Sequence, residues 1–292
     1  MSPRVWTVLT GGALAVAVAA AWLGVRFVTS PPPVLPEPAV ATPTPIRRAS
    51  APAREPVLLP GRSVPLTVLM YHHIGPAPAN ARGWVHDLYV PAERFERDLA
   101  RLQEHRCCVM TMAQAVRFIA EDRLPRNAVV LTFDDGYEDN ASIAAPLLQR
   151  HGLVGTFNVV VSKIGDGKHM SREQLRKLAA AGHEIGCHSL THPDLRRVDD
   201  ARLQRETADA RRDLETLLGR PVVTYCYPDG KYDDRALRAV AGADYRVALA
   251  TGLPTGRFDT ARPFEVGRYR VTPRKDIPAA LLQDRSEETA RE

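Results

Sequence analysis

The chain from residue 61 onward alternates short apolar runs with longer amphipathic segments. The short runs are rich in β-branched residues and are bounded by Gly, Pro or polar residues, which predicts strands that are buried on both faces. These runs lie at 66–71, 128–133, 154–161, 183–187, 222–226, 245–250 and 266–271.

The segments between these runs repeat apolar residues every three or four positions, which predicts helices. The helices are expected at 92–104, 113–122, 140–151, 171–181, 199–218 and 233–241. Ser171 and Gln174 form a capping box, and the many charges of 199–218 are typical of a solvated face. Strands and helices alternate over about 200 residues without a break in composition, which indicates one α/β domain, 61–275. Seven strands are enough to close, or nearly close, a parallel barrel.

Two adjacent carboxylates, Asp134 and Asp135, follow the apolar run 128–133 directly and precede Gly136. Neighbouring side chains on a strand point to opposite faces, but a glycine turn lets both reach one pocket. One carboxylate can then bind a cation while the other stays free as a base. Taken alone, Asp-Asp-Gly is more typical of a polar turn that ends a strand.

Other polar side chains also follow the carboxyl ends of predicted strands. They are His72, His188, His192 and the segment Tyr227-Pro228-Asp229-Gly230. In a parallel barrel these strand ends face one rim, where active sites are built from the loops between strands and helices. We therefore expect these residues and the Asp pair to meet in one site.

The segment His188-Ser-Leu-Thr-His192 places two imidazoles four residues apart. Two histidines and one carboxylate make a three-ligand site for a divalent metal that leaves positions open for water. A lone histidine is usually structural, but this pair beside an Asp pair favours metal. A metal lowers the pKa of bound water, the second Asp supplies a base, and a histidine suits the general acid. The set indicates metal-assisted hydrolysis of an ester or amide.

Thr132-Phe-Asp-Asp-Gly-Tyr137 and His188-Ser-Leu-Thr-His192-Pro193 together resemble the first two motifs of polysaccharide deacetylases. This is carbohydrate esterase family 4, also called the NodB-homology domain, and the resemblance covers about residues 66–271. It implies a distorted (β/α)7 barrel. It also implies that Asp134 is the catalytic base and that Asp135, His188 and His192 hold a divalent metal, usually zinc, with cobalt, nickel or iron as alternatives.

The segment Tyr227-Pro228-Asp229-Gly230 resembles the third motif of this family, in which a backbone amide helps to hold the oxyanion. Many members have an aromatic residue in place of Asp229 and an arginine just before it, and this chain has neither. A backbone donor survives a change of side chain, although the carboxylate could alter substrate preference. Arg268 or Arg270 is a candidate for the missing arginine's role of orienting Asp134.

The family's late Leu-x-His motif, which usually supplies the general acid, is absent because no histidine follows His192. Met70-Tyr-His-His-Ile74 instead is similar to the poly-N-acetylglucosamine deacetylase subgroup, whose catalytic histidine lies near the domain start. The resemblance implies His72 as the acid, and strand alternation turns His73 elsewhere. Five further histidines show no partner pattern: His86, His105, His151, His169 and His183. Trp84 and Tyr89 lie in the loop expected between the first strand and the first helix. Their rings could stack on a sugar or equally fill space in the core.

The N-terminal region indicates export. Residues 5–28 form an almost unbroken apolar stretch, long enough to span a membrane. We expect residues 1–30 to be an uncleaved signal anchor, with a cleaved signal peptide as the alternative. Ten prolines in 31–60 predict an extended linker. We therefore expect a membrane-anchored catalytic domain in the periplasm or extracellular space, followed by a charged tail, 276–292.

Charge and cysteine content narrow the class of partner. The net charge is +5, but residues 1–60 hold five Arg against two Glu, so the remaining domain is nearly neutral. This argues against nucleic acid as a partner, and no protein partner is indicated. The four cysteines have no zinc-finger spacing and define no disulfide pairing.

The sequence therefore predicts a metal-dependent hydrolase that removes acetyl groups from N-acetylated amino sugars of a cell-surface or extracellular polysaccharide. An O-acetyl polysaccharide esterase would use the same machinery and is the nearest alternative. A non-catalytic polysaccharide-binding or secretion scaffold would not need a base beside its metal. A metal phosphoesterase would favour more carboxylates and a second metal.

Overall fold

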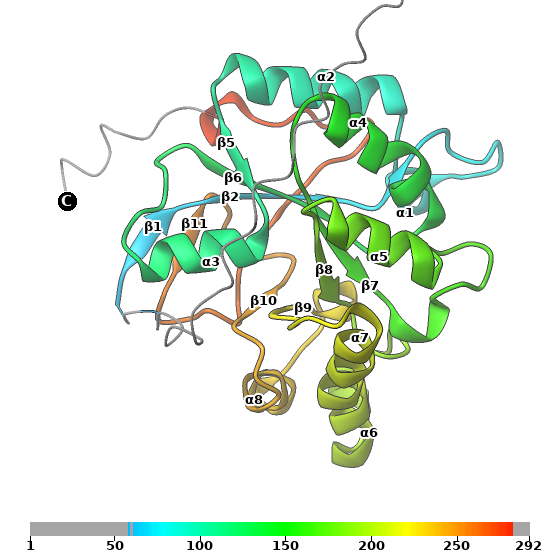
Figure 1. Cartoon of the computed structure of the whole chain (residues 1–292), viewed down its shortest axis with the longest axis vertical. Helices are drawn as coiled ribbons and strands as arrows, with labels where there is room; N and C mark the ends of the chain where they lie inside the picture. Colours follow the sequence, from blue (N-terminus) through cyan, green and yellow to red (C-terminus); the bar gives the residue numbers. More distant parts are fainter. Residues whose placement is uncertain (1–57, 59–60, 283–292) are drawn as a thin grey trace, which may run out of the picture. The chain divides into compact units, whose positions relative to one another are not determined.

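A row of parallel strands forms the centre of the fold in the computed structural model (Figure 1). Along the row every neighbouring pair is parallel. The order is β10 (Val247–Leu249), β9 (Thr224–Cys226), β8 (Glu184–Cys187), β7 (Thr156–Val159), β6 (Ala128–Phe133), β2 (Thr67–Tyr71) and β12 (Tyr269–Arg270). Val266, just before β12, also bridges Leu249 of β10. The segment 266–270 therefore touches both ends of the row, and the predicted distorted (β/α)7 barrel is confirmed.

Five short strands lie beside this row and were not predicted. β5 (Cys108–Met110) pairs with the first half of β6. β1 (Ser63–Pro65) and β11 (Arg257–Asp259) form an antiparallel pair, and β3 (His73–Ile74) pairs in parallel with β4 (Tyr89–Val90). Each has only two or three residues, which is too short for hydrophobic alternation to be read from sequence.

Helices surround the strands (Figure 1), and all except α1, which lies where a loop was expected, are close to their predicted positions. They are α1 (Gly83–His86), α2 (Ala92–Glu104), α3 (Met112–Ala120), α4 (Ala145–Arg150), α5 (Arg172–Ala180), α6 (Asp200–Gln204), α7 (Ala210–Leu218) and α8 (Asp234–Gly242). Ser171 and Gln174 make the expected capping box at α5. π-helical turns at Asn140–Ala144 and Arg205–Asp209 precede α4 and join α6 to α7.

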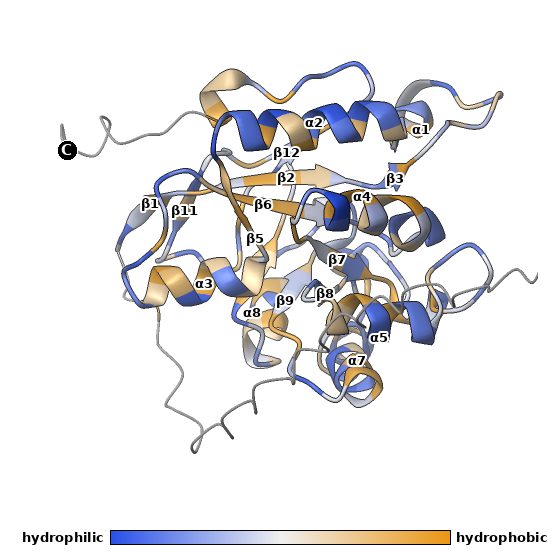
Figure 2. Cartoon of the chain, turned by 45° about the horizontal axis from the view of Figure 1, so that its top comes forward, coloured by the Kyte–Doolittle hydropathy of each residue, from blue (hydrophilic) through white to orange (hydrophobic). Residues whose placement is uncertain are grey.

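Both faces of the strands are buried, as the continuous apolar runs require. Leu69 and Leu131 belong to the core between the strands and most of the helices, whereas Val68 and Val130 belong to a second core that α3 covers. Figure 2 shows β2 and β6 in orange, while α2 and α3 carry blue residues as well as orange ones. β2 and β6 are buried along their whole length, because their side chains alternate between the two cores.

The structure describes residue 58 and residues 61–282. The predicted signal anchor, almost all of the linker and most of the charged tail lie outside these residues. Among the described residues, no helix has both the length and the hydropathy needed to cross a membrane.

Gly186 on β8 offers a test of how tightly the strands pack. A Cβ atom at this position would lie 2.3 Å from Oδ1 of Asn158, which is fully buried on β7. We expect Gly186→Ala to lower the free energy of unfolding by about 1–3 kcal/mol through overpacking, measured by urea denaturation. Gly242→Ala in α8 is the control, since a Cβ there meets open space. Equal stability of the two variants would contradict this packing.

Candidate active site

A cavity of about 480 Å³ opens at the carboxyl ends of the central strands. It gathers nearly every residue that the sequence placed in the site: His72, Asp134, Asp135, His188, His192, Tyr227, Asp229, Gly230, Arg268 and Arg270. Trp84, Leu88, Tyr137 and Lys163 also line it. Of the predicted set, only Pro228 is not part of this wall.

The strands position three of these residues directly. The amide of Asp134 donates to the Tyr71 carbonyl, and that of His188 donates to the Val159 carbonyl. The amide of Tyr227 donates in the same way to Leu249. Each residue thus extends the hydrogen bonding of its strand by one step before the chain turns away, which fixes its place at the rim.

Asp134 is buried and held by a bidentate ion pair. Nη1 and Nη2 of Arg268 each lie 2.8 Å from one of its carboxylate oxygens, and Asn158 Nδ2 donates to Oδ1 at 2.8 Å. Burial by itself would raise the pKa of Asp134, but the charge of Arg268 outweighs it and holds the pKa far below its usual range. The carboxylate is therefore ionised and fixed in orientation.

The two candidate arginines differ in what they contact. Arg268 is buried and also donates to Thr132 Oγ1 and to the Ala250 carbonyl. Arg270 lines the cavity, and its buried Nε has no hydrogen-bond partner among the described residues. The contact with Asp134 thus comes from Arg268.

Asp135, His188 and His192 present three ligand atoms to one point. Oδ1 of Asp135 lies 3.5 Å from Nε2 of each histidine. Nδ1 of His188 donates to the Cys226 carbonyl at 2.8 Å, because a carbonyl can only accept. With Nδ1 donating, Nε2 of His188 is the ring nitrogen that faces Asp135 and can bind a cation. Two imidazoles and a carboxylate with this tautomer fit a divalent transition metal.

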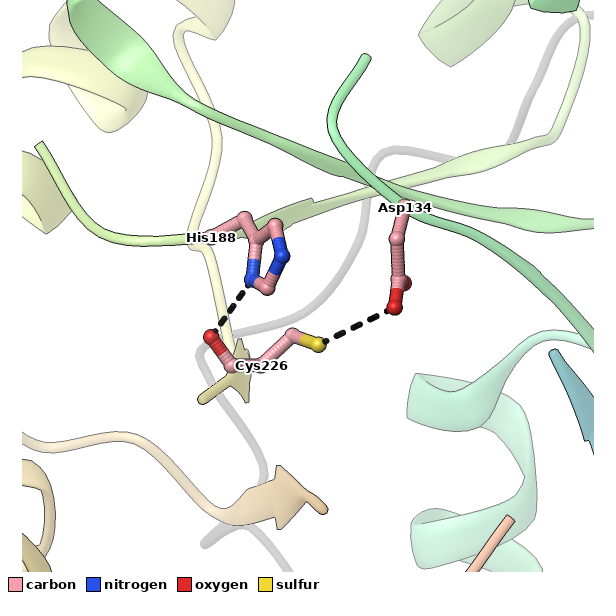
Figure 3. A group of neighbouring side chains, drawn as sticks. All are labelled: Asp134, His188 and Cys226. Atoms are coloured by element: carbon pink, nitrogen blue, oxygen red, sulfur yellow. Dashed lines mark hydrogen bonds between the residues drawn. The ribbon is translucent and has the colours of Figure 1, made fainter. Parts of the chain in front are cut away.

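Cys226 could complete a different metal-ligand set with Asp134 and His188 (Figure 3). Its Sγ lies 3.6 Å from Asp134 and 3.2 Å from Nη2 of Arg268. Burial raises the pKa of the thiol, so it stays protonated and can donate to Asp134. Because a cation here would face the guanidinium of Arg268, this group forms the wall of the base site and does not suit a metal.

Left-handed backbone shapes the loops that carry these ligands. Asp135 has φ 69°, Ser189 has φ 66° and His192 has φ 62°, a region that is uncommon for residues other than glycine. Such strain persists only where the surroundings fix it. Glu206 does so for the histidine loop, since its carboxylate accepts from the amide and hydroxyl of Thr191 at 2.8 and 2.6 Å.

Glu206 and Asn158 are site-supporting residues that the sequence analysis missed. Glu206 is only 1% exposed, so the interpretation of 199–218 as a merely solvated face was wrong at this position. Asn158 could have been noticed, because it is an amide inside an otherwise apolar strand. Glu206 gave no such signal, since it stands among other charges on its helix.

His72 lines the cavity, while His73 is directed at Asp139. Asn140 Nδ2 donates to the His72 carbonyl at 2.8 Å and fixes its backbone. Burial, opposed by Asp134 and Asp135, lowers the pKa of His72 to about 4. The ring is therefore neutral at neutral pH in the protein without substrate.

The segment Tyr227–Gly230 offers one backbone donor. Pro228 has no N–H, and the amides of Tyr227 and Gly230 donate to the carbonyls of Leu249 and Tyr227. The amide of Asp229, whose φ is 53°, is the remaining one. Gly230 is required here, because a Cβ would lie 2.0 Å from Oγ1 of Thr251.

The buried ion pair predicts a large loss of stability when one partner is removed. We expect Arg268→Gln to lower the free energy of unfolding by about 3–5 kcal/mol, because it leaves the Asp134 charge buried and unpaired. Adding Asp134→Asn should recover part of this loss. The control is Arg262→Gln, which breaks an exposed pair with Glu265 and should cost at most about 1 kcal/mol. Urea denaturation measures all three, and equal losses for Arg268→Gln and Arg262→Gln would contradict the geometry.

Comparisons with known proteins agree on one family. Residues 121–248 match the family model for polysaccharide deacetylase. YxkH of Bacillus subtilis strain 168 is 28% identical over 209 residues, which are 71% of this chain and 72% of that protein. The chitooligosaccharide deacetylase of Bradyrhizobium sp. strain ANU 289 is 32% identical over 103 residues, 35% of this chain and 45% of that one. The Streptococcus pyogenes deacetylase PplD, solved in complex with acetate, has the same fold with a TM-score of 0.67 at 24% identity, covering 73% of this chain and 95% of its own. The match of the family model therefore places residues 121–248 in the polysaccharide deacetylase family.

Proposed function

We propose that this protein is a metal-dependent deacetylase that acts on N-acetylated amino sugars of a polysaccharide. The observation that carries the proposal is the pairing of an ionised, clamped Asp134 with the ligand set Asp135, His188 and His192 in one cavity. A relative that is named a chitooligosaccharide deacetylase supports an N-acetylated substrate. The position of His72 near the domain start favours an exopolysaccharide of N-acetylglucosamine.

The ligand set would hold zinc, with cobalt, nickel or iron as alternatives. When bound, the cation supplies a Lewis acid that polarises the acetyl carbonyl and lowers the pKa of water. His188 and Asp135 are buried, which excludes bulk water from that side of the site. The half-buried His192 leaves an approach from the cavity.

Asp134 is the proposed general base. Arg268 holds its two oxygens in one plane and keeps the carboxylate ionised, so it is ready to accept a proton from the attacking water at any working pH. The low pKa means that Asp134 keeps this proton only briefly and passes it on. The amide of Asp229 is the proposed donor to the carbonyl oxygen as negative charge develops there.

His72 is the proposed general acid for the departing amine. Since its pKa is about 4 without substrate, the ring has to take up a proton after the substrate binds and before the C–N bond breaks. The carboxylates of Asp134 and Asp135 favour the protonated ring by their charge. Negative charge on the substrate oxygen acts in the same direction.

Trp84 is the proposed contact for a neighbouring sugar. It is 71% exposed, the one large hydrophobic side chain of the described residues with such exposure, and it lines the catalytic cavity. An exposed indole beside a polar cavity offers an apolar face for the C–H side of a pyranose ring. Tyr89, the other aromatic candidate, packs against His73.

The N-terminal apolar segment 5–28 and the proline-rich segment 31–60 support an exported, membrane-tethered enzyme. A retained anchor would leave the full-length chain in the membrane fraction. A shortened chain in the soluble periplasmic or extracellular fraction would instead support a cleaved signal peptide.

Acetate release from N-acetylglucosamine oligomers tests the activity. We expect the metal-stripped protein to be inactive, zinc to restore release, and Asp134→Asn to lower kcat about 10²- to 10⁴-fold, because the general base is lost. His72→Ala should lower kcat to a similar degree. Release from an O-acetylated substrate alone would favour the esterase. Zinc binding without turnover on either substrate would favour the non-catalytic scaffold.

Trp84→Ala tests the proposed sugar contact. We expect KM for N-acetylglucosamine oligomers to rise about 3- to 10-fold, since an aromatic contact contributes about 1 kcal/mol, with little change in kcat. Trp84→Phe should retain part of the affinity. An unchanged KM in Trp84→Ala would place the oligomer elsewhere on the rim.

A further inference from the structure

Four aromatic rings form a continuous stack beside the candidate metal site. The His73 ring lies between Tyr89, at 4.1 Å with an interplanar angle of 2°, and Tyr137, at 3.5 Å and 20°. Tyr137 in turn stacks on His169 at 5.1 Å and 23°. The rings come from four separate segments of the chain. His73 and Tyr89 are also paired through β3 and β4, and Tyr137 and His169 through an antiparallel bridge, so the contact between His73 and Tyr137 joins these two pairs.

Tyr137, one of the two middle rings of the stack, lies close to a candidate metal ligand. Burial raises the pKa of the Tyr137 hydroxyl, and the charge of the Asp135 carboxylate, two residues earlier, and a hydrogen bond with it act in the same direction. Asp135 and Gly136 are both left-handed, with φ of 69° and 77°, and a Cβ on Gly136 would lie 3.0 Å from Val159. A backbone of this kind needs external support to keep the Asp135 oxygen directed at the two histidines.

Contacts with residues 169 and 170 also hold the backbone of Gly136 and Tyr137 in place. The Met170 amide donates to the Gly136 carbonyl at 2.9 Å, and Tyr137 forms an antiparallel bridge with His169. His169 is itself fixed through Nδ1 to the carboxylate of Asp166 at 2.9 Å. The last ring of the stack is therefore anchored to its own loop.

His73, the other middle ring of the stack, is connected to the candidate general acid His72 through Asp139 and Asn140. Nδ1 of His73 lies 2.5 Å from Oδ2 of Asp139, and Oδ1 of Asp139 accepts from Ile74 N and from Asn140 Nδ2 at 3.1 and 2.9 Å. The same Asn140 nitrogen donates to the His72 carbonyl. The carboxylate of Asp139 thus connects the ring of His73 to the backbone that presents His72.

We propose that Tyr137 and His73 are positioning residues, which hold Asp135 in its ligand geometry and His72 at the cavity wall. The inference rests on the proposed function, because it takes Asp135, His188 and His192 as the cation site. Tyr137 acts through its hydroxyl on Asp135, and His73 acts through Asp139 and Asn140 on His72. A stack that only stabilised the fold would need its rings but would not need these two polar contacts.

Tyr137→Phe separates the two roles, because it keeps the ring and removes the hydroxyl. We expect the Kd for zinc, measured on the full chain in detergent by competition with a chromophoric chelator, to rise about 10- to 100-fold, as for other residues that orient a metal ligand. The urea midpoint of the metal-free protein should change little. Tyr89→Phe is the matched control, since it removes a hydroxyl from the same stack away from Asp135, and its Kd should remain that of the wild type.

His73→Phe tests the proposed role of His73 in positioning His72. It keeps a stacking ring and removes the contact with Asp139, so we expect kcat to fall at least 10-fold while the Kd for zinc stays within about threefold of the wild type. A zinc Kd in Tyr137→Phe equal to that of Tyr89→Phe would overturn the inference for Tyr137, even if the variant were less stable. An unchanged kcat in His73→Phe would overturn it for His73.

The wild-type protein and Asp135→Asn distinguish failure of this inference from failure of the proposed function. Wild-type protein that binds no zinc, or binds it as Asp135→Asn does, would remove the cation site and the positioning role with it. Tight zinc binding by the wild type that is lost in Asp135→Asn but unchanged in Tyr137→Phe would keep the cation site and remove only the positioning role.

Discussion

The bidentate pair between Arg268 and Asp134 links the fold to its chemistry. Arg268 lies on the segment that touches both ends of the strand row, and Asp134 lies at the end of the central strand β6. Both are almost completely buried, so neither charge is solvated without the other. One contact therefore links the closing segment of the barrel to the charge state of the candidate base.

Around this pair, the site combines residues in a strained backbone conformation with neighbouring residues whose contacts fix that conformation. Asp135, His192 and Asp229 are left-handed residues that carry side chains, and each lies where a ligand or donor must point into the cavity. Glu206 and the ring stack supply the opposing contacts. The arrangement is typical of functional sites, where local strain is tolerated because the surrounding packing fixes one geometry.

Sequence patterns anticipated most of the fold and most of the candidate site. The seven long apolar runs became the central strands, because strands buried on both faces leave a continuous hydrophobic signal. Strands of two or three residues, such as β3 and β4, left none. The Asp pair and the histidine pair could be predicted from sequence because the residues of each pair are close together in the chain, on one loop. The polar residues at the ends of the predicted strands also indicated a site at one rim of the barrel.

The sequence by itself determined the identity and spacing of the chemical groups: the candidate base, the candidate metal ligands, and a histidine early in the domain. Only the tertiary structure decided between the two candidate arginines. Arg268 and Arg270 differ by two positions, yet Arg268 contacts Asp134. His72 faces the cavity as strand alternation predicted, whereas the place of His73 in the ring stack came from the structure alone. Asn158 and Glu206 became partners of the site in the same way. These choices depend on contacts between segments far apart in the chain, which hydrophobic periodicity and local spacing do not encode.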